Sequence, residues 1–552
     1  MISNIRYWFL LFLVLLVYIA GMFATLFEND SAQFATMAMR MAQENDFLNL
    51  YKGPEEYLDK PHMHYWLAAL SFKIFGIFDW AYRLPAILAI LFGGYSCYGL
   101  GSLLYNNNTG KLAALIFLTC QTIVLSVIDV RTDAVLTGFA IFSIWQLAAY
   151  IETRSVKNII LGAFGAGVAF STKGQIALVV IGLPILCHLA YTRKWIRLLN
   201  WKVLIALLVF SIAITPMLYA YYHQFDLHPE KIIRGRGERS GIFFIFWEQS
   251  FERMSGEGIG KNSSDYFFFF HTFLWVFLPW TVIGLFALCS RIKTLVKLRF
   301  AFKPNYEFLT LGGIILIFIL ISFAQFKLPH YLNITMPLFS VLSASYLYSL
   351  YRFTKRKTIK WVLGIQYFVL AVVFVASVLI CFFVFKFENP LNYIWTTALI
   401  LLAIFYSLKQ EEYYLRIITV SVISSLLLNA VLNFHFYPNL LTYQAGSEMA
   451  KVVAENDIPV DRIYKLSERY TWALDFYNRR PVILSSIKDI QNKRNIWVYA
   501  TSMELRELNN LGFDWDRQFT KDQFRITRLQ GKFLDPSTRK KVVEKMHLIH
   551  IY

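Results

Sequence analysis

Long apolar stretches separated by short polar segments fill the chain from residue 7 to residue 437. A helix needs about 20 apolar residues to cross a bilayer, and the pattern predicts about thirteen such spans. Their predicted limits are 7–27, 84–104, 112–130, 134–151, 158–172, 175–192, 203–225, 266–290, 308–326, 331–351, 361–385, 391–408 and 415–437. The pattern therefore predicts an all-α polytopic membrane protein over residues 1–437.

Composition agrees with this fold class. Of the 552 residues, 57% are hydrophobic and only 16% are charged, whereas a soluble protein carries about 25% charged residues. The first span, 7–27, is longer than the apolar core of a signal peptide, which has roughly 7–15 residues, and no small-residue cleavage site follows it. We therefore expect it to be a retained membrane helix. The five cysteines all lie in apolar runs, which predicts no disulfide framework.

The distribution of basic residues predicts the orientation. Net charge is +18, and we interpret the excess as a topology signal and as contact with anionic lipid rather than as a nucleic-acid site. With the N-terminus inside, the strong basic clusters between spans all fall on the inner side, in loops 154–157, 192–202, 291–303, 352–360 and 409–416. An odd number of spans then places the C-terminal tail outside.

Two long loops and the C-terminal tail lie outside in this topology. The loop 28–83 contains helix-like stretches at 35–42 and 64–78, and the loop 226–265 is rich in glycine and charge. The tail 438–552 changes composition sharply. Its pattern predicts helices at 446–456 and 503–510 and buried strands at 462–465 and 497–500, which indicates a small soluble α/β domain.

Charged residues beside the first span are the first candidates for function. Glu28, Asp30 and Lys60 follow that span, and charges placed against a membrane are costly enough to suggest a functional site. The simpler alternatives are a helix N-cap or a solvated acid for Asp30, and an interface lysine for Lys60.

Further cations lie on the outer side, where basic residues are not expected. Each alone resembles an ordinary interface anchor. Together with one or two acids, they suit an anionic lipid-phosphate ligand. The set comprises Lys60, Arg83, Arg131, Lys173 and Lys327.

The ordered set of these motifs resembles the GT-C glycosyltransferases. Within them it is similar to the protein mannosyltransferase-like superfamily, near the bacterial lipid A aminoarabinose (4-amino-4-deoxy-L-arabinose) transferases. The resemblance covers roughly residues 5–350. It is carried by Asp30, Asp59-Lys60-Pro61 with Tyr65-Trp66, Arg83-Leu84-Pro85, Asp133, Thr172-Lys173-Gly174, Pro279-Trp280 and Lys327-Leu328-Pro329-His330-Tyr331.

The resemblance implies an inverting transfer of a sugar from a polyprenyl-phosphate donor to a lipid A-like, glycan or protein acceptor. Asp30 falls at the position of the catalytic carboxylate and would act as general base. Donor-phosphate binding would involve Lys60, Arg83, Lys173, Lys327 and Tyr331, with Glu28 and Asp133 as possible support. The implied setting is a bacterial inner membrane, with a monomeric multi-pass chain and a periplasmic C-terminal domain.

The sequence departs from the aminoarabinose transferases at several positions. Gln33 and Phe34 stand where those enzymes have Arg-Tyr, and Asp59 replaces a glutamate. The segment 247–253 lacks the histidine that the family associates with a metal. Asp59 and Glu248 remain as possible ligands of a divalent metal, and no other cofactor is implied.

Two other classes stay open at this stage. A transporter or flippase of a lipid-linked sugar would show paired broken helices near the middle of the membrane and internal symmetry, and the sequence shows neither. A non-catalytic scaffold would not need an acid surrounded by cations on the outer side.

Overall fold

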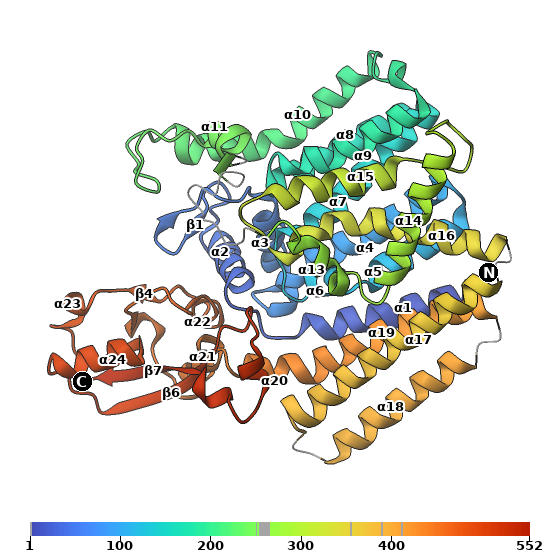
Figure 1. The fold of residues 1–552 in the computed structure, drawn as a ribbon. Coiled ribbons are helices and arrows are strands. Elements are labelled where there is room, and N and C mark those ends of the chain that lie inside the picture. The colour runs from blue at the N-terminus through green and yellow to red at the C-terminus, as the bar shows by residue number, and fades with distance from the viewer. Residues whose placement is uncertain (1–2, 250, 253–264, 354–355, 388–389, 410–411) are drawn as a thin grey trace.

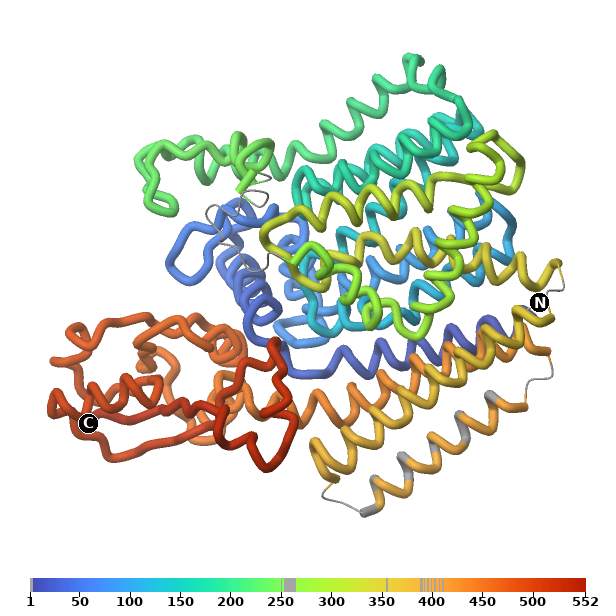
Figure 2. Tube along the Cα trace, in the orientation of Figure 1, coloured from blue at the N-terminus to red at the C-terminus, as the bar shows by residue number. Residues whose placement is uncertain are grey.

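A helix bundle and a smaller sheet-containing unit make up the computed structural model of the protein (Figure 1). It describes residues 3–249, 251–252, 265–353, 356–387, 390–409 and 412–552. The N-terminus lies at the end of the bundle far from the sheet, and the C-terminus lies in the sheet unit (Figure 2).

The bundle contains a helix at every predicted span. Its main helices are α1 (Asn4–Met22), α4 (Asp79–Leu104), α5 (Asn107–Thr119), α7 (Thr132–Thr153), α8 (Val156–Lys173), α9 (Ile176–Thr192), α10 (Lys202–Tyr221), α13 (Phe268–Val276), α14 (Thr281–Lys297), α15 (Leu309–Phe323), α16 (Met336–Arg352), α17 (Arg356–Leu379), α18 (Pro390–Leu408) and α19 (Tyr413–Val431). Of the described residues, six helical stretches are long and apolar enough to cross a membrane, and α9 and α15 are shorter apolar helices. The number thirteen stays a prediction.

The predicted spans 112–130 and 266–290 are each divided, the first at Cys120 between α5 and α6 (Gln121–Ser126). The stretch 266–290 forms two helices, α13 and α14, joined by a turn around Pro279. Proline has no N–H group for the helical ladder, and the carbonyl of Leu278 instead accepts the N–H of Gln121 at 2.9 Å. The apolar run is long enough for one helix, but these backbone contacts end it.

Helix α7 lies at the centre of the bundle, between α4 and α8. Glycines allow the close approach: a Cβ built on Gly138 would lie 2.2 Å from the carbonyl oxygen of Ala89, and one on Gly93 would lie 3.2 Å from Gly138 Cα. Most side chains of α7 are buried, which explains its uniform apolar pattern. This packing fixes the position of Thr132 and Asp133 in its first turn.

The loop 28–83 folds over the helix ends. It contains α2 (Asp30–Glu44), a hairpin of β1 (Tyr51–Lys52) and β2 (Glu55–Glu56), and α3 (Met63–Phe75). The helices predicted at 35–42 and 64–78 are thus confirmed, with α2 starting earlier than predicted. Figure 1 shows α2 and α3 between the bundle and the sheet unit.

The C-terminal sheet unit, residues 445–551, contains the predicted strands and helices. Its main elements are α21 (Ala445–Glu455), β3 (Ile463–Lys465), α22 (Trp472–Tyr477), β4 (Ile483–Leu484), β5 (Ile496–Thr501), α24 (Ser502–Asn510), β6 (Arg517–Gln523) and β7 (Glu544–Ile551). The strand order is β4-β3-β5-β7-β6, with β4, β3 and β5 parallel and β7 antiparallel to its neighbours. Strand β5 is buried along nearly its whole length and β7 over most of its second half, which accounts for the apolar runs in the tail.

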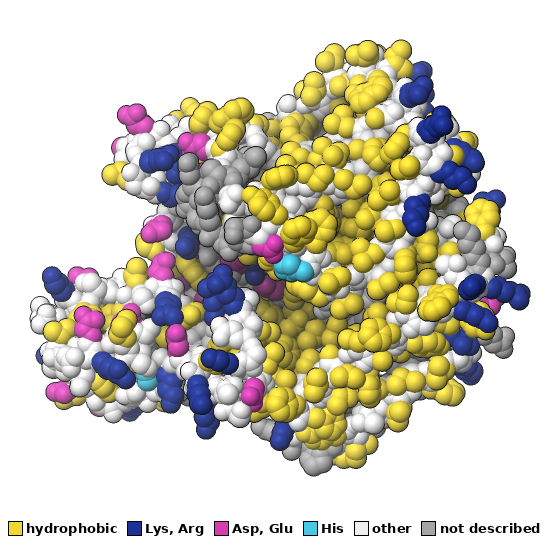
Figure 3. All heavy atoms as spheres, viewed as in Figure 1, with side chains coloured by type: hydrophobic (Ala, Val, Ile, Leu, Met, Phe, Trp, Pro, Cys, Tyr) yellow, Lys and Arg dark blue, Asp and Glu magenta, His cyan; other side chains and the backbone are white. Residues whose placement is uncertain are grey.

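The surface separates into zones. Hydrophobic side chains cover the visible face of the bundle, Lys and Arg gather at its far end, and charges of both signs are scattered over the sheet unit (Figure 3). A broad apolar belt between two charged ends is what a bilayer requires of a multi-pass protein.

Candidate active site

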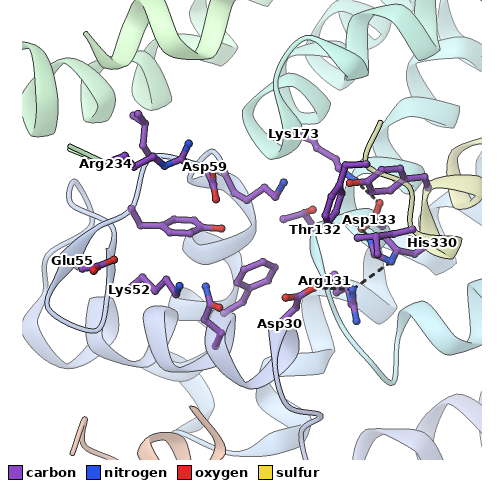
Figure 4. A pocket seen from close by; sticks show the side chains of 18 of the residues that line it. Asp30, Lys52, Glu55, Asp59, Arg131, Thr132, Asp133, Lys173, Arg234 and His330 are labelled. Carbon is purple, nitrogen blue, oxygen red and sulfur yellow. Dashed lines mark hydrogen bonds and ion pairs between the residues drawn. The ribbon is translucent and has the colours of Figure 1, made fainter. Parts of the chain in front are cut away.

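A polar cavity of about 300 Å³ opens between the loop 28–83 and the ends of the bundle helices. Its walls come from α2, the β1–β2 hairpin, the starts of α7 and the 3-10 turn η4 (Pro329–Thr335), and the end of α8. Figure 4 shows charged side chains facing it from both sides. Five are cationic and five are acidic, so the lining is formally neutral: Lys52, Lys60, Arg131, Lys173 and Arg234, with Asp30, Glu55, Glu56, Asp59 and Asp133.

Asp30 points into this cavity from the first residue of α2. The helix N-cap is Asn29, so Asp30 does not serve as the cap. Its Oδ2 lies 2.7 Å from Arg131 Nη1, and Arg131 Nη2 contacts Asp129 Oδ2 at 2.9 Å. The Asp30 side chain remains 42% exposed. Arg131 therefore orients a carboxylate that is still open to a molecule in the cavity.

Asp133 and Lys173 form a buried ion pair in the opposite wall. Lys173 Nζ lies 2.6 Å from Asp133 Oδ1, and the two side chains are 12% and 4% exposed. The same ammonium lies 4.8 Å from the ring centroid of Tyr331, within cation–π range. The segments 172–174 and 327–331 are distant in sequence, and they contact each other through Lys173 and Tyr331.

His330 lies between these two ion pairs. Burial lowers its pKa well below the ordinary value of 6.5, and the cations Arg131, Lys173 and Lys60 add to this effect against the opposing effect of Asp133. The imidazole is therefore neutral at pH 7, and its Nδ1 accepts a long hydrogen bond of 3.4 Å from Arg131 Nη1. The 3.7 Å contact with Asp133 is then not an ion pair.

The other side of the cavity holds Lys60 and its neighbour Asp59. Asp59 forms an ion pair with Arg234, and its carbonyl accepts a hydrogen bond from Gln249 Nε2 at 2.6 Å. These contacts come from the segment after α10 and fix the backbone that carries Lys60. Lys60 faces the cavity within electrostatic range of His330.

The residues considered for a divalent metal do not fit one. Asp59 pairs with Arg234, whereas Glu248 pairs with Arg239 at 3.0 Å and does not line the cavity. Over the part of the chain that the structure describes, three or more His, Cys, Asp or Glu side chains nowhere gather as metal ligands would. Residues 253–264 of this loop lie outside the described residues.

Arg83 lies away from the cavity and has another role. It is fully buried, and its guanidinium donates hydrogen bonds to the carbonyls of Ile128, Met22, Ala24 and Thr25. The structure thus does not bring Arg83 to the cavity, and its role in donor-phosphate binding stays a prediction. Arg83 fixes the segment between α1 and α2 that leads to Asp30.

Lys327 and Glu28 also fall outside the cavity lining. Lys327 Nζ lies 5.2 Å from the ring centroid of Tyr266, and Glu28 is buried against the C-terminal sheet unit. The structure adds Lys52, Arg234 and His330 to the lining and places Arg131 on Asp30. Arg131 and His330 stood inside quoted motifs, whereas nothing in the sequence singled out Lys52 or Arg234.

Comparisons with known proteins agree with the motifs. The chain matches the dolichyl-phosphate-mannose-protein mannosyltransferase family over residues 59–219. It is 25% identical over 327 residues to an undecaprenyl phosphate-α-4-amino-4-deoxy-L-arabinose arabinosyl transferase of Proteus mirabilis, covering 58% of this chain and 55% of that protein. A Yersinia pestis protein of the same name is 26% identical over 351 residues, covering 61% and 58%. The match thus spans little more than half the length of these relatives.

Among solved structures, ArnT from Cupriavidus metallidurans bound to undecaprenyl phosphate superposes with a TM-score of 0.75 at 17% identity, over 98% of this chain and 97% of that one. Its apo form gives 0.74 at 16% identity, over 99% and 98%. The chain therefore has the fold of this transferase. Its sequence is similar to the sequences of bacterial aminoarabinose transferases, as the motifs predicted.

Proposed function

We propose that this protein is an integral-membrane glycosyltransferase that moves a sugar from a polyprenyl-phosphate donor to a lipid A-like or other acceptor, with inversion. One observation carries the proposal: an open carboxylate, Asp30, shares a cavity with Lys60, Lys173 and Tyr331. A general base opposite phosphate-binding cations is what such a transfer needs.

In this mechanism Asp30 accepts the proton of the acceptor hydroxyl or phosphate. The acceptor oxygen attacks C1 of the sugar, the bond from C1 to the donor phosphate breaks, and polyprenyl phosphate leaves with that electron pair. Lys60 and Lys173 stabilise the charge that grows on the phosphate in the transition state. Arg131 keeps the Asp30 carboxylate in place, and Asp133 holds Lys173.

The identity of the sugar and acceptor forms part of the proposal. The relatives' names contain 4-amino-4-deoxy-L-arabinose and undecaprenyl phosphate, which favours an aminopentose and a polyprenyl carrier of that kind. Comparing envelope lipids and glycans by mass spectrometry, with and without the protein, tests this: loss of an aminopentose from lipid A supports it, and loss of a hexose elsewhere contradicts it.

The membrane arrangement completes the proposal. Thirteen spans with the N-terminus inside place the cavity and the C-terminal domain, residues 438–552, at the periplasmic face of a bacterial inner membrane. Figure 3 supports this orientation because Lys and Arg gather at the bundle end opposite the sheet unit. We do not adopt the transporter alternative, since the cavity residues lie at helix ends and in loops and not at broken helices within the bundle.

Asp30→Asn and Lys60→Ala test the mechanism with purified protein and a polyprenyl-phosphate sugar. Asp30→Asn should lower kcat by about 10²–10⁴-fold, the usual contribution of a general base, and should leave donor binding in place. Lys60→Ala should weaken donor binding. Asp522→Asn, an exposed acid on β6, is the control. Wild-type turnover in Asp30→Asn would exclude Asp30 as the base.

A further inference from the structure

Glu28 lies buried where the segment that leads to Asp30 contacts the C-terminal sheet unit. It is 3% exposed and stands two residues before Asp30, between α1 and α2. Its Oε1 accepts the backbone N–H of Trp472 at 2.8 Å, and its Oε2 accepts that of Ala473 at 2.9 Å. Both donors belong to the first turn of α22. One carboxylate therefore ties the loop before Asp30 to a segment more than 440 residues away.

The backbone around Glu28 is held from the same side. The N–H of Glu28 donates to Gln444 Oε1 at 2.7 Å, and Gln444 Nε2 donates to the carbonyl of Leu26 at 2.8 Å. The N–H of Leu26 donates to the Tyr477 hydroxyl at 2.8 Å. Gln444 is fully buried. The side chain and the main chain of this loop thus both depend on the C-terminal region.

Helix α2 itself rests on α22 and the residues after it. Thr36 Oγ1 lies 3.2 Å from the carbonyl oxygen of Trp472, and Gln43 Nε2 donates to the carbonyl of Arg479 at 2.8 Å. Figure 1 shows α2 next to α22. Since Asp30 is the first residue of α2, contacts before it and along its helix both define where its carboxylate lies.

The sheet unit holds α22 through a second buried charge. Lys465 on β3 contacts Asp475 of α22 at 2.7 Å, with side chains 3% and 1% exposed. Asp475 Oδ1 also accepts the N–H of Val482 at 2.8 Å. The contacts run without interruption from β3 through α22 to Glu28.

We propose that Glu28 is a positioning residue through which the C-terminal sheet unit holds Asp30 in its place at the cavity. This deepens the proposed function and rests on it for its catalytic meaning. It gives the C-terminal region a stated role: it is needed for turnover because it fixes the base, while the phosphate-binding cations Lys60 and Lys173 are held by other elements.

Glu28→Gln in the full-length protein tests the inference. The amide replaces one acceptor oxygen by an NH₂ group, so one of the two N–H donors of α22 loses its partner. We expect amide hydrogen exchange to accelerate at least about fivefold across residues 26–34 and 472–476, and kcat to fall about 10- to 100-fold. Binding of polyprenyl phosphate should stay within about twofold of wild type, because its cations are unchanged.

The controls separate this role from general destabilisation. Glu448→Gln changes a glutamate of the sheet unit that pairs with exposed Lys451, and it should alter neither exchange at 26–34 nor turnover. Gln444→Met removes the hydrogen bonds that Gln444 makes with Leu26 and Glu28. This variant is used for the test if Glu28→Gln does not fold. In a double variant the two losses of kcat should be less than additive, since both act on one segment.

Two results would overturn the inference: exchange at 26–34 that does not change in Glu28→Gln, or faster exchange with wild-type kcat. Failure of the proposed function looks different. Wild-type protein would then transfer no sugar, while the exchange result would still report whether Glu28 holds the loop.

Discussion

The buried ion pair of Asp133 and Lys173 is relevant both to stability and to the proposed binding of the donor. Removing one partner of a buried ion pair leaves an uncompensated charge, which costs up to about 3–5 kcal/mol. We therefore expect Asp133→Asn to lower the thermal midpoint clearly. The exposed pair Arg40–Glu44, with side chains 28% and 51% exposed, is the control, and Arg40→Ala should cost less than about 1 kcal/mol.

The double variant Asp133→Leu with Lys173→Met separates the two roles. Replacing both charges by apolar groups of similar size removes the buried charge, so stability should recover relative to Asp133→Asn. Sugar transfer should stay low, because the ammonium proposed to bind the phosphate is gone. Thermal melts and turnover measured on the same samples check this. Full activity in the double variant would show that Lys173 does not bind the donor.

At this scale the sequence predicted much of the cavity. Asp30, Lys60, Asp133, Lys173 and Tyr331 come from five separate segments, and the structure brings them to one lining. Arg83 differed because its partners are backbone carbonyls, which leave no mark in a sequence pattern. Lys52 and Arg234 were missed because they face the cavity only through the fold of a short hairpin and a loop.

At the scale of elements, the crossing of α4 and α7 sets the cavity wall. Gly138→Ala would place a Cβ 2.2 Å from the Ala89 carbonyl oxygen, which the helices can relieve only by moving apart. We expect a loss of about 1–3 kcal/mol, typical of overpacking, and lower turnover because α7 carries Asp133. Gly364→Ala on α17 meets nothing within 4 Å and should be neutral or slightly stabilising. Equal thermal midpoints for the two variants would contradict this account.

The periodicity of the sequence predicted where most helices and strands lie. It did not predict the residues at which they end. The apolar runs located the bundle helices, and the tail pattern located α21, β3, β5 and α24. The division of 266–290 into α13 and α14 depends on Pro279 and on a hydrogen bond from Gln121. The pairing of β5 with β7, about 50 residues apart, also depends on contacts distant in sequence.

For the whole molecule, cysteine labelling checks the proposed orientation. The background is a variant without the five natural cysteines. In it, Asp522→Cys in the sheet unit and Lys303→Cys between α14 and α15 should differ in their labelling by a reagent that cannot cross the membrane. Both positions are exposed. An impermeant maleimide should label the first in spheroplasts and the second only after lysis. Labelling of both positions from one side would contradict thirteen spans.

The contact between bundle and sheet unit should also make stability depend on pH. Burial raises the pKa of Glu28 from 4.5 to about 7, against the lowering effect of its two backbone hydrogen bonds, and burial raises that of Asp475 from 3.8 to about 6, with Lys465 opposing it. Tyr499 also faces Glu28. Between the unfolded and folded pKa values the folded state binds more protons, so stability falls as pH rises through this window.

Melting wild type and Glu28→Gln between pH 5 and pH 8 tests this. Between pH 5 and pH 8, the free energy of unfolding should fall less in Glu28→Gln than in wild type. The difference due to Glu28 alone should be at most about 3 kcal/mol. A pH dependence identical in the two proteins would show that Glu28 does not titrate in this range.

The equal numbers of cations and acids around the cavity have a consequence for the order of events. A donor phosphodiester brings one negative charge into a neutral lining. After transfer, the phosphate monoester carries nearly two, but the proton taken up by Asp30 offsets the added charge, so the total is unchanged while the bonds rearrange. Once Asp30 loses that proton to water, the cavity holds an excess of negative charge. Loss of the proton from Asp30 would then favour release of the polyprenyl phosphate. Its release returns the cavity to its starting charge.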